Sequence, residues 1–297
     1  PDKCYSITRA EQGLELIHQG RLDDDTLTVM KVIGDAYCVN ENQLRRYLSL
    51  NQFSFSRTSK LLSYLRKYRL IERYKCRLAF IEEEDEEAIV KPPAPFALGI
   101  GGYKLLKYLY PSSPFMEASY WYEQPLNVQR YVAMNEMRCL AAETGVLRQW
   151  DWNPPIGGST KYKRPMAVAK LETPQGDIQF LMERTQMAQN FNAYLRDKLE
   201  FYRYLYEKDG YFRVDGSSKA VMQVVCIYTS SLSMARYIQE DIGLHRFPFD
   251  VWILVDEWIS KEKGMSEAFC IVKKQEIQRI RLPFFSQSFH VDNPINA

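Results

Sequence analysis

The sequence is poor in residues that form metal centres and disulfide frameworks. Its 297 residues include three histidines and six cysteines, and no two cysteines are spaced as a CxxC pair. Such scattered thiols argue against a zinc finger and are typical of reduced, buried cysteines, so we expect a cytoplasmic protein. His18, His245 and His290 lie far apart in the sequence and give no metal or triad signal.

Long apolar runs are also missing. The most apolar stretches, AVMQVVCIYT and FDVWILV, have the length of strands and are too short to span a bilayer. The chain starts without a charged and then apolar leader, so we expect neither secretion nor a membrane partner. A GxSxG elbow and a P-loop are absent, and the glycines of FALGIGGYKLL (96–106) lack the spacing of a dinucleotide loop.

Positive charge is concentrated in one segment. Between Gln43 and Arg77 the chain carries ten Lys and Arg against one acid, Glu72, so this segment has a net charge of +9 and the remainder −7, within a total of +2. Charge separated in this way predicts a polyanionic partner. The alternative is a basic face that an acidic domain of the same chain balances.

The basic segment has the pattern of a winged helix-turn-helix, which we predict for residues 25–81 after an N-terminal segment, 1–24. Apolar residues at helical spacing predict three helices, in TLTVMKVIGD (26–35), after a cap at Asn40, and from Ser54 or Ser56 onward. LIERYKCRLAFI (70–81) then predicts two short strands around Lys75 and Cys76.

The third helix of such a domain enters the major groove of DNA, so its outward residues must carry donors for base edges and phosphates. We predict an inward stripe of Thr58, Leu61, Leu62 and Leu65 on this helix, and an outward stripe of Arg57, Lys60, Tyr64 and Lys67. The predicted DNA-binding residues are Arg45, Arg46, Arg57, Lys60, Tyr64, Lys67, Arg73, Lys75 and Arg77. A winged helix that binds only protein is the alternative.

An acidic run, EEEDEE (82–87), and the proline-rich KPPAP (91–95) predict a solvated linker, which with a connecting helix covers residues 82–125. We predict an α/β domain over residues 126–259. Its first long helix ends at Gly145, and three strands follow; then come a second long helix from about Asn190 to Glu207, a strand, a helix and a strand.

The order α-β-β-β-α-β is that of restriction-endonuclease-like folds. The remaining residues, 260–297, predict a C-terminal strand and tail. The strand carries the basic residues Lys274, Arg279 and Arg281, and it either extends the sheet or contacts DNA.

The hairpin RPMAVAKLETPQGDIQFLMER (164–184) falls where those folds hold their catalytic edge. Magnesium-dependent cleavage needs carboxylates and a lysine near the attacking water. The metal candidates are Glu172 and Glu183, and the catalytic candidates are Glu183 and Lys198. Lys198 lies in the apolar stripe of the second long helix, so its burial requires a carboxylate, and Glu183 is the nearest in this topology. Such a pair is either a catalytic remnant or a structural ion pair.

These features resemble the replication-relaxation family of plasmid and mobile-element proteins, over about Thr26 to Ser231. The resemblance rests on the winged-helix pattern and on the segments FALGIGGYKLL, VAMNEM, RPM, FLMERTQ and LRDKLEFY. It implies a winged helix and a nuclease-like domain with an Arg-Pro-Asp, an acidic pair, and a helix that carries a Lys and a Tyr. The residues that match this pattern are Arg164, Pro165, Lys198 and Tyr202.

The sequence departs from that pattern at its acidic positions. Met166 replaces the aspartate, and only Glu183 remains of the acidic pair. Methionine is not a ligand for magnesium, and one glutamate is a poor cage for it. We therefore expect a catalytically degenerate domain and no cofactor.

Three functions follow from these patterns. The first is a non-catalytic DNA-binding protein of a plasmid, phage or conjugative element, acting in replication, transfer or its regulation. It would bind double-stranded DNA as a homodimer or within a replication or transfer complex. The second is a metal-dependent endonuclease or nickase that uses magnesium with Glu172, Glu183 and Lys198. The third is a protein–protein adaptor that binds through aromatic segments such as EASYWYEQP (117–125).

Overall fold

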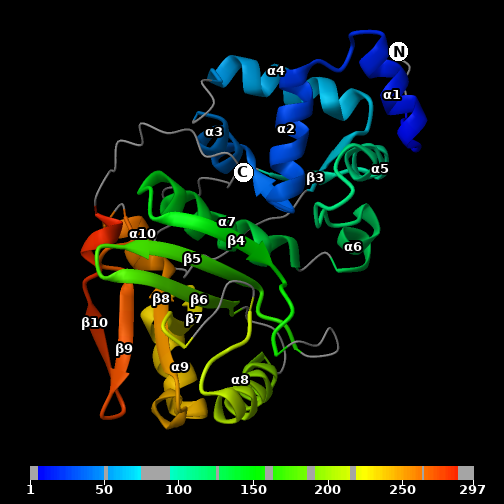
Figure 1. Ribbon diagram of the computed structural model, residues 1–297. Coiled ribbons are helices and arrows are strands. Elements are labelled where there is room, and N and C mark those ends of the chain that lie inside the picture. The colour runs from blue at the N-terminus through cyan, green and yellow to red at the C-terminus, as the bar shows by residue number, and fades with distance from the viewer. Residues whose placement is uncertain are drawn as a thin grey trace. The chain divides into compact units, whose positions relative to one another are not determined.

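Two units, Pro1–Cys139 and Leu140–Ala297, make up the chain in the computed structural model, and both combine helices with β-structure (Figure 1). The residues described are 6–49, 53–74, 94–124, 127–157, 163–185, 191–214, 219–262 and 264–286. Among these residues, no helix combines the length and the apolar character needed to cross a membrane. The four described cysteines, Cys38, Cys139, Cys226 and Cys270, are buried, and no disulfide joins any two of them.

The first unit places helices around a small antiparallel sheet, whose strand order is β1-β3-β2. Its described elements are α1 (Ala10–His18), α2 (Asp24–Asp35), β1 (Cys38–Asn40), α3 (Glu41–Ser49), α4 (Phe55–Lys67), β2 (Ile71–Arg73), β3 (Pro95–Leu98), α5 (Ile100–Leu109), α6 (Ala118–Glu123) and most of α7 (Asn127–Glu143). The three helices predicted between residues 26 and 67 are α2, α3 and α4.

Side-chain caps fix where these three helices begin. The Asp23 carboxylate accepts hydrogen bonds from the hydroxyl and the backbone N–H of Thr26, and these bonds lower its pKa. The Asn40 side chain accepts from the backbone N–H of Gln43 at 2.9 Å, which confirms the predicted cap of α3. Ser54 caps α4 by accepting from the backbone N–H of Arg57.

Strand β2 has a described partner that the sequence did not predict, whereas the turn and the second strand predicted around Lys75 and Cys76 lie outside the described residues. β2 pairs with β3, so that Ile71 lies opposite Leu98 and Arg73 opposite Phe96. The chain between these strands therefore leaves and re-enters the same sheet. The acidic run and most of the proline-rich segment, which were predicted to form a linker, lie outside the described residues. Pro95–Leu98 escaped prediction because all four residues of this strand are buried and show no alternation.

Glycines let helix α5 approach the neighbouring backbone closely. A Cβ atom at Gly102 would lie 2.0 Å from the carbonyl oxygen of Leu70, and one at Gly101 would lie 2.3 Å from that of Ile7. Any larger residue would push α5 away from these segments. The glycines of FALGIGGYKLL thus have a packing role in this unit.

Polar contacts attach helix α7 to the first unit as far as Cys139. The amide nitrogen of Asn135 donates to the carbonyl oxygens of Ala36 and Cys38, at 2.8 and 2.9 Å. The amide nitrogen of Gln43 donates to the carbonyl oxygen of Val132 at 2.8 Å. We predicted that the second domain begins at residue 126, whereas the observed division lies within α7, because these buried amides satisfy backbone groups around β1.

The second unit contains a seven-stranded mixed sheet with the order β10-β9-β8-β7-β6-β5-β4. Strands β6, β7 and β8 are parallel, and the outer strands are antiparallel to their neighbours. The described elements are β4 (Leu147–Trp152), β5 (Ala167–Thr173), β6 (Gly176–Arg184), α8 (Phe191–Asp209), β7 (Met222–Thr229), α9 (Leu232–Ile242), β8 (Asp250–Val255), α10 (Asp256–Glu262), β9 (Phe269–Lys273) and β10 (Glu276–Ile280). The order of elements predicted for residues 147–255 is confirmed.

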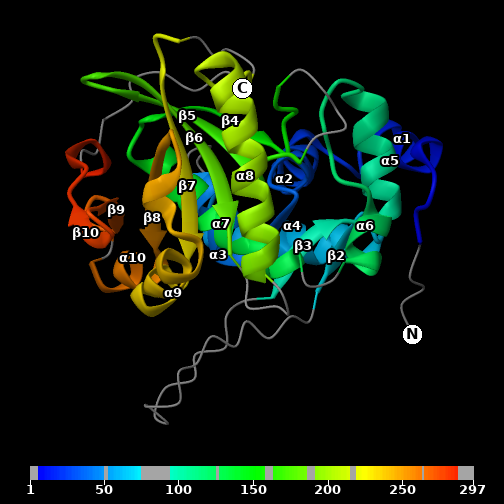
Figure 2. The same cartoon turned by 90° about the horizontal axis from the view of Figure 1, so that it is seen from below.

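Helices α8 and α9 cover one face of this sheet (Figures 1 and 2). Leu199 of α8 and Ile238 of α9 share a buried cluster with Leu181, Val225 and Ile253 of the central strands. The intervening residues point to the opposite face, where aromatic rings pack together: Phe180 with Trp252, and Phe269 with Phe180 and Phe285. Side chains that alternate along β6 therefore face two different environments.

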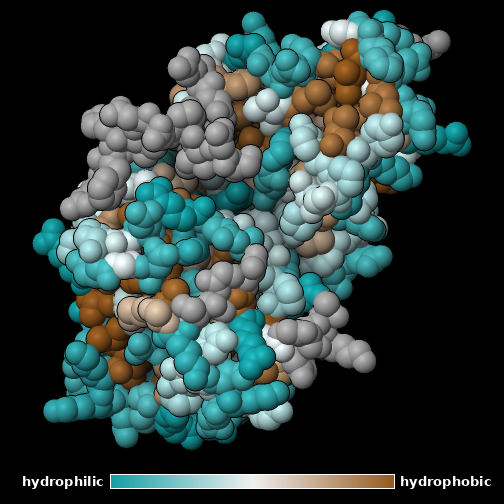
Figure 3. Space-filling model, in the orientation of Figure 1, coloured by the Kyte–Doolittle hydropathy of each residue, from teal (hydrophilic) through white to brown (hydrophobic). Residues whose placement is uncertain are grey.

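The C-terminal strands extend the sheet. β9 and β10 form a hairpin that turns at Lys274 and Gln275, both with positive φ, and β9 pairs with β8. In the view of Figure 3, hydrophilic residues cover most of the described surface, with apolar patches between them.

Candidate functional site

The exposed face of helix α4 is the first candidate site. Thr58, Leu62 and Leu65 are buried, and the residues on the other side of the helix are half-buried or exposed. At about 100° per residue, the side chains of this face span an arc of roughly 140°. We call this set the α4 face: Phe55, Ser56, Ser59, Lys60, Ser63, Arg66 and Lys67.

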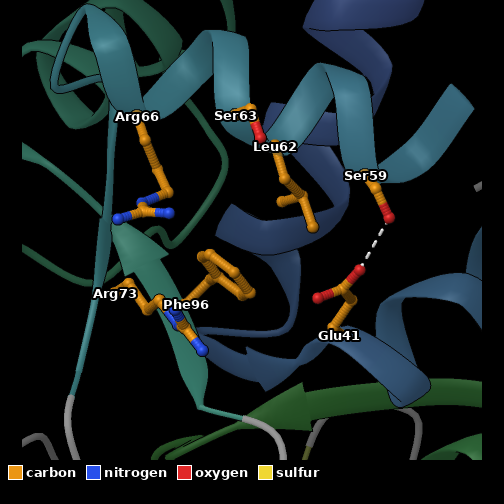
Figure 4. A pocket seen from close by; sticks show the side chains of 7 residues that line it. All are labelled: Glu41, Ser59, Leu62, Ser63, Arg66, Arg73 and Phe96. Atoms are coloured by element: carbon orange, nitrogen blue, oxygen red, sulfur yellow. Dashed lines mark hydrogen bonds between the residues drawn. The ribbon is translucent and has the colours of Figure 1, made fainter. Parts of the chain in front are cut away.

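A pocket of about 250 Å³ lies beside this face (Figure 4). Its lining residues come from α3, α4, β2 and β3: Glu41, Ser59, Leu62, Ser63, Arg66, Arg73 and Phe96. Arg66 extends from α4 toward the strand that carries Phe96, and Arg73 enters from β2. Two guanidinium groups and two hydroxyls in one pocket offer the donors that a phosphate group accepts from.

The carboxylate in this pocket has partners of its own. Glu41 Oε1 accepts hydrogen bonds from the Ser59 hydroxyl at 2.9 Å and from the Arg45 guanidinium at 2.5 Å. Arg45 therefore offsets the charge of Glu41. No ion pair of Arg66 or Arg73 occurs within the described part of the chain.

Several of the predicted DNA-binding residues have internal contacts instead. Arg46 forms an ion pair with Glu136, and Arg57 forms one with Asp25. The Tyr64 hydroxyl donates to the carbonyl oxygen of Arg21 at 2.8 Å, and burial raises the pKa of Tyr64 to about 12. Of the predicted outward stripe, Arg57 is exposed but paired with Asp25, whereas Tyr64 is half-buried and packs against the core of this unit.

The remaining predicted residues do lie on the α4 face or beside it. Lys60, Lys67 and Arg73 are exposed, and none of them forms an ion pair with a described residue. Lys75 and Arg77 lie outside the described residues. The prediction missed Arg66 and the serines of the pocket. Taking Ser54 as the cap and drawing the helical wheel from there would have placed Arg66 outward, one turn from Ser63.

The second candidate site is a buried cluster at the end of strand β6. The ammonium group of Lys198 lies 2.7 Å from Glu183 Oε2, and the side chains of both residues are only 3% exposed. The pairing inferred from the apolar stripe of this helix is thus present. The Tyr202 hydroxyl donates to the other carboxylate oxygen at 2.5 Å. Burial and the neighbouring Glu183 charge raise the pKa of Tyr202 well above its usual range, so the tyrosine stays protonated and continues to donate.

The other metal candidate lies at the far end of the hairpin from this cluster. Glu172 is paired in register with Asp177, at the turn, and forms an exposed ion pair with Arg148. The path along β6 from Asp177 to Glu183 is roughly 20 Å, at about 3.3 Å per residue. The prediction that Glu172 and Glu183 share one metal ion is therefore wrong, since no ion reaches both carboxylates.

The position of the missing aspartate is an apolar one in this structure. Met166 is 4% exposed, and its backbone N–H donates to the carbonyl oxygen of Met182 at 3.0 Å. A thioether thus occupies the strand position next to Glu183. Within the described ranges, no three His, Cys, Asp or Glu side chains gather closely enough to hold one metal ion.

A second buried cation lies on the opposite face of β6. The guanidinium of Arg184 lies 4.1 Å from the centre of the Tyr228 ring and 3.6 Å from a carboxylate oxygen of Asp256. The Tyr228 hydroxyl donates to the same carboxylate at 2.5 Å. Glu183 and Arg184 thus carry opposite charges to opposite faces of the strand, each with its own acid–base partners.

Comparison with protein-family models, with curated proteins and with solved structures gives no match. The resemblance to the replication-relaxation family therefore stays a prediction.

Proposed function

We propose that this chain is a DNA-binding protein whose first unit is a winged helix that grips double-stranded DNA through α4. The observation that carries the proposal is the α4 face together with Arg73. It holds Lys60, Arg66 and Lys67, and no described acidic side chain forms an ion pair with these four cations. Positive charge that is not paired with any described carboxylate, beside an exposed helix, favours a polyanion as the partner.

The topology of the first unit supports this proposal. From α2 to β3 the order of elements is helix, strand, helix, helix, strand, strand, and the three strands form one antiparallel sheet. In a winged helix of this order the last helix before the paired strands is the one that enters the major groove. Here that helix is α4, and the basic pocket lies between it and the strands.

The second unit we propose to be a nuclease-like domain that does not cut DNA. Strands β4 to β7 and helix α8 follow the β-β-β-α-β order of restriction-endonuclease-like folds. Both oxygens of Glu183 accept hydrogen bonds from buried donors, and Met166 occupies the place of a second acid. The Glu183–Lys198 pair then stabilises the unit. The proposed role in replication, transfer or its regulation on a mobile element rests on the family resemblance.

The test is a binding titration of fluorescent DNA duplexes over a salt series. For the unmodified protein we expect log K to fall steeply and linearly with log salt. Removing one phosphate contact should lower the slope by about 0.9, so Arg66→Ala, Arg73→Ala and Lys60→Ala should each produce this change. Arg57→Ala is the matched control: its cation is on the same helix but paired with Asp25, so its slope should stay close to that of the parent.

The same samples should be incubated with supercoiled plasmid, with magnesium or manganese and with a chelator. We expect no nicking in either condition. Metal-dependent nicking that is lost in Glu183→Gln would make the chain an endonuclease instead. Absence of both binding and cutting would favour the protein–protein adaptor.

A further inference from the structure

One large apolar side chain on the α4 face is mostly exposed. Phe55, the first residue of α4, is 70% exposed, the highest value among the large hydrophobic side chains of the described residues. A single exposed apolar residue is common on protein surfaces and has no meaning by itself. The surroundings of Phe55 distinguish it from such residues.

The Phe55 ring is held in place by a charged scaffold. The Arg45 guanidinium lies 4.7 Å from the centre of the ring, a cation–π distance. Arg45 is itself fixed by Glu41 at 2.5 Å and by the Ser59 hydroxyl at 2.7 Å. An ordered contact therefore covers part of the ring, while most of it stays open to solvent.

The position of Phe55 on the helix matches the geometry of a major groove. At about 100° per residue, Phe55 lies roughly 20° from Arg66 and roughly 40° from Ser59 around the helix axis. Along the axis, Phe55 and Arg66 are about 16 Å apart, at about 1.5 Å per residue. The groove is about 12 Å wide, so Arg66 can reach the phosphates at its edge while the first turn of α4 meets the base edges.

Only one base edge suits an aromatic ring that carries no donor or acceptor. Base pairs present hydrogen-bonding groups in the major groove, and the single apolar group among them is the C5-methyl of thymine. We propose that Phe55 packs against a thymine methyl and makes this chain select thymine at that position. This inference rests on the proposed DNA-binding function and adds a specificity-determining residue to it.

The experiment removes the methyl group from the DNA and leaves the protein intact. The preferred duplex is first selected from a random pool, and each thymine in it is then replaced by uracil, one position at a time. We expect one or two positions at which uracil weakens binding about 4-fold, the effect of one buried methyl group. In Phe55→Ala the thymine and uracil duplexes should bind equally well.

Controls separate this inference from the function on which it rests. Tyr237→Ala removes another exposed aromatic, 51% exposed in the second unit, and should keep the preference for thymine. Phe55→Ala should keep the salt slope of the parent, because Phe55 carries no charge.

Equal binding of thymine and uracil duplexes at every position would overturn the role of Phe55 while DNA binding stands. A preference for thymine that survives in Phe55→Ala would overturn it too, as would selection that enriches no sequence. A protein that binds no duplex at all would remove the proposed function itself.

Discussion

Two cations of the second unit and two of the first differ in burial and in ion pairing. In the second unit, Lys198 and Arg184 are almost completely buried, and each lies close to a carboxylate, Glu183 or Asp256. In the first unit, Arg66 and Arg73 are exposed in a pocket and form no ion pair with a described residue. A buried cation without a partner costs several kcal/mol, whereas an exposed one costs little. The charges of Lys198 and Arg184 are therefore part of the packed interior, whereas those of Arg66 and Arg73 remain at the surface.

The largest effect should come from breaking the buried pair. In Glu183→Gln the ammonium group of Lys198 loses its counter-charge, and we expect a loss of about 3–5 kcal/mol in the free energy of unfolding. Urea titration followed by tryptophan fluorescence measures it, since four of the five tryptophans lie after residue 140.

The matched control for this variant is Glu172→Gln. It breaks the exposed pair with Arg148 and should cost no more than about 1 kcal/mol. Equal effects of the two variants would show that the Glu183–Lys198 pair does not stabilise the fold.

The first unit should respond to packing more than to charge. Gly102→Ala places a Cβ atom against the carbonyl oxygen of Leu70, so we expect a loss of about 1–3 kcal/mol in the free energy of unfolding. Circular dichroism during thermal unfolding measures it. Gly264→Ala, whose Cβ would meet no atom within 4 Å, should leave the melting temperature close to that of the parent. If Gly102→Ala left the free energy of unfolding unchanged, the stability of the unit would not depend on the close approach of α5 to Leu70.

The protonated Tyr202 hydroxyl should make the stability of the second unit depend on pH in the alkaline range. Because its folded pKa lies above the unfolded value of about 10, the stability that it contributes is complete below pH 10 and is lost as the pH rises further. Above pH 10 this loss should be about 1.4 kcal/mol per pH unit, until the folded pKa is reached. Melting temperatures from pH 8 to pH 11 should fall less steeply in Tyr202→Phe. The control, Tyr204→Phe, changes a tyrosine that is 58% exposed and should keep the slope of the parent.

The smallest effect should be that of the exposed cations on folding. Arg66→Ala and Arg73→Ala should change the free energy of unfolding by no more than about 0.5 kcal/mol, because neither side chain is ion-paired with any described residue. Urea titration followed by far-ultraviolet circular dichroism measures this change. A loss of several kcal/mol in either variant would give these arginines a structural role and would weaken the contrast between the units.

Periodic patterns predicted the elements, while contacts distant in sequence escaped prediction. The second unit followed from strands with continuous apolar runs and from helices with one apolar side, and Lys198 within such a stripe predicted its ion pair. The pairing of β2 with β3 did not follow, since β3 lies beyond a long connection and its four residues are all buried, without the alternation of a half-exposed strand. Helix α1 was not predicted because Gly13 interrupts its pattern of apolar residues. The Leu105 side chain packs against Gly13 and leaves no room for a Cβ atom there.

The candidate site was predictable in its location and not in its detail. Composition alone identified the basic segment around α4. The orientation of α4 decides which cations face outward, and it depends on Leu62 and Leu65 meeting the rest of the core. A rotation of the helix by one residue changes the exposed set, so the half-buried Tyr64 was assigned outward and the exposed Arg66 was overlooked. The ion partners of Arg46 and Arg57 lie on other helices, and no local pattern reveals them.

The two outer strands of the large sheet bear on whether copies of this protein aggregate. Unpaired backbone groups at a sheet edge can recruit a strand from another molecule and start a fibre. At one edge, the pairing of β4 with β5 shifts register between Leu147 and Gln149, and this irregularity disrupts a template for a flat partner strand. At the other edge, β10 exposes Glu276, Gln278 and Arg279, which a second copy would have to desolvate. Both edges thus oppose the growth of a continuous intermolecular sheet.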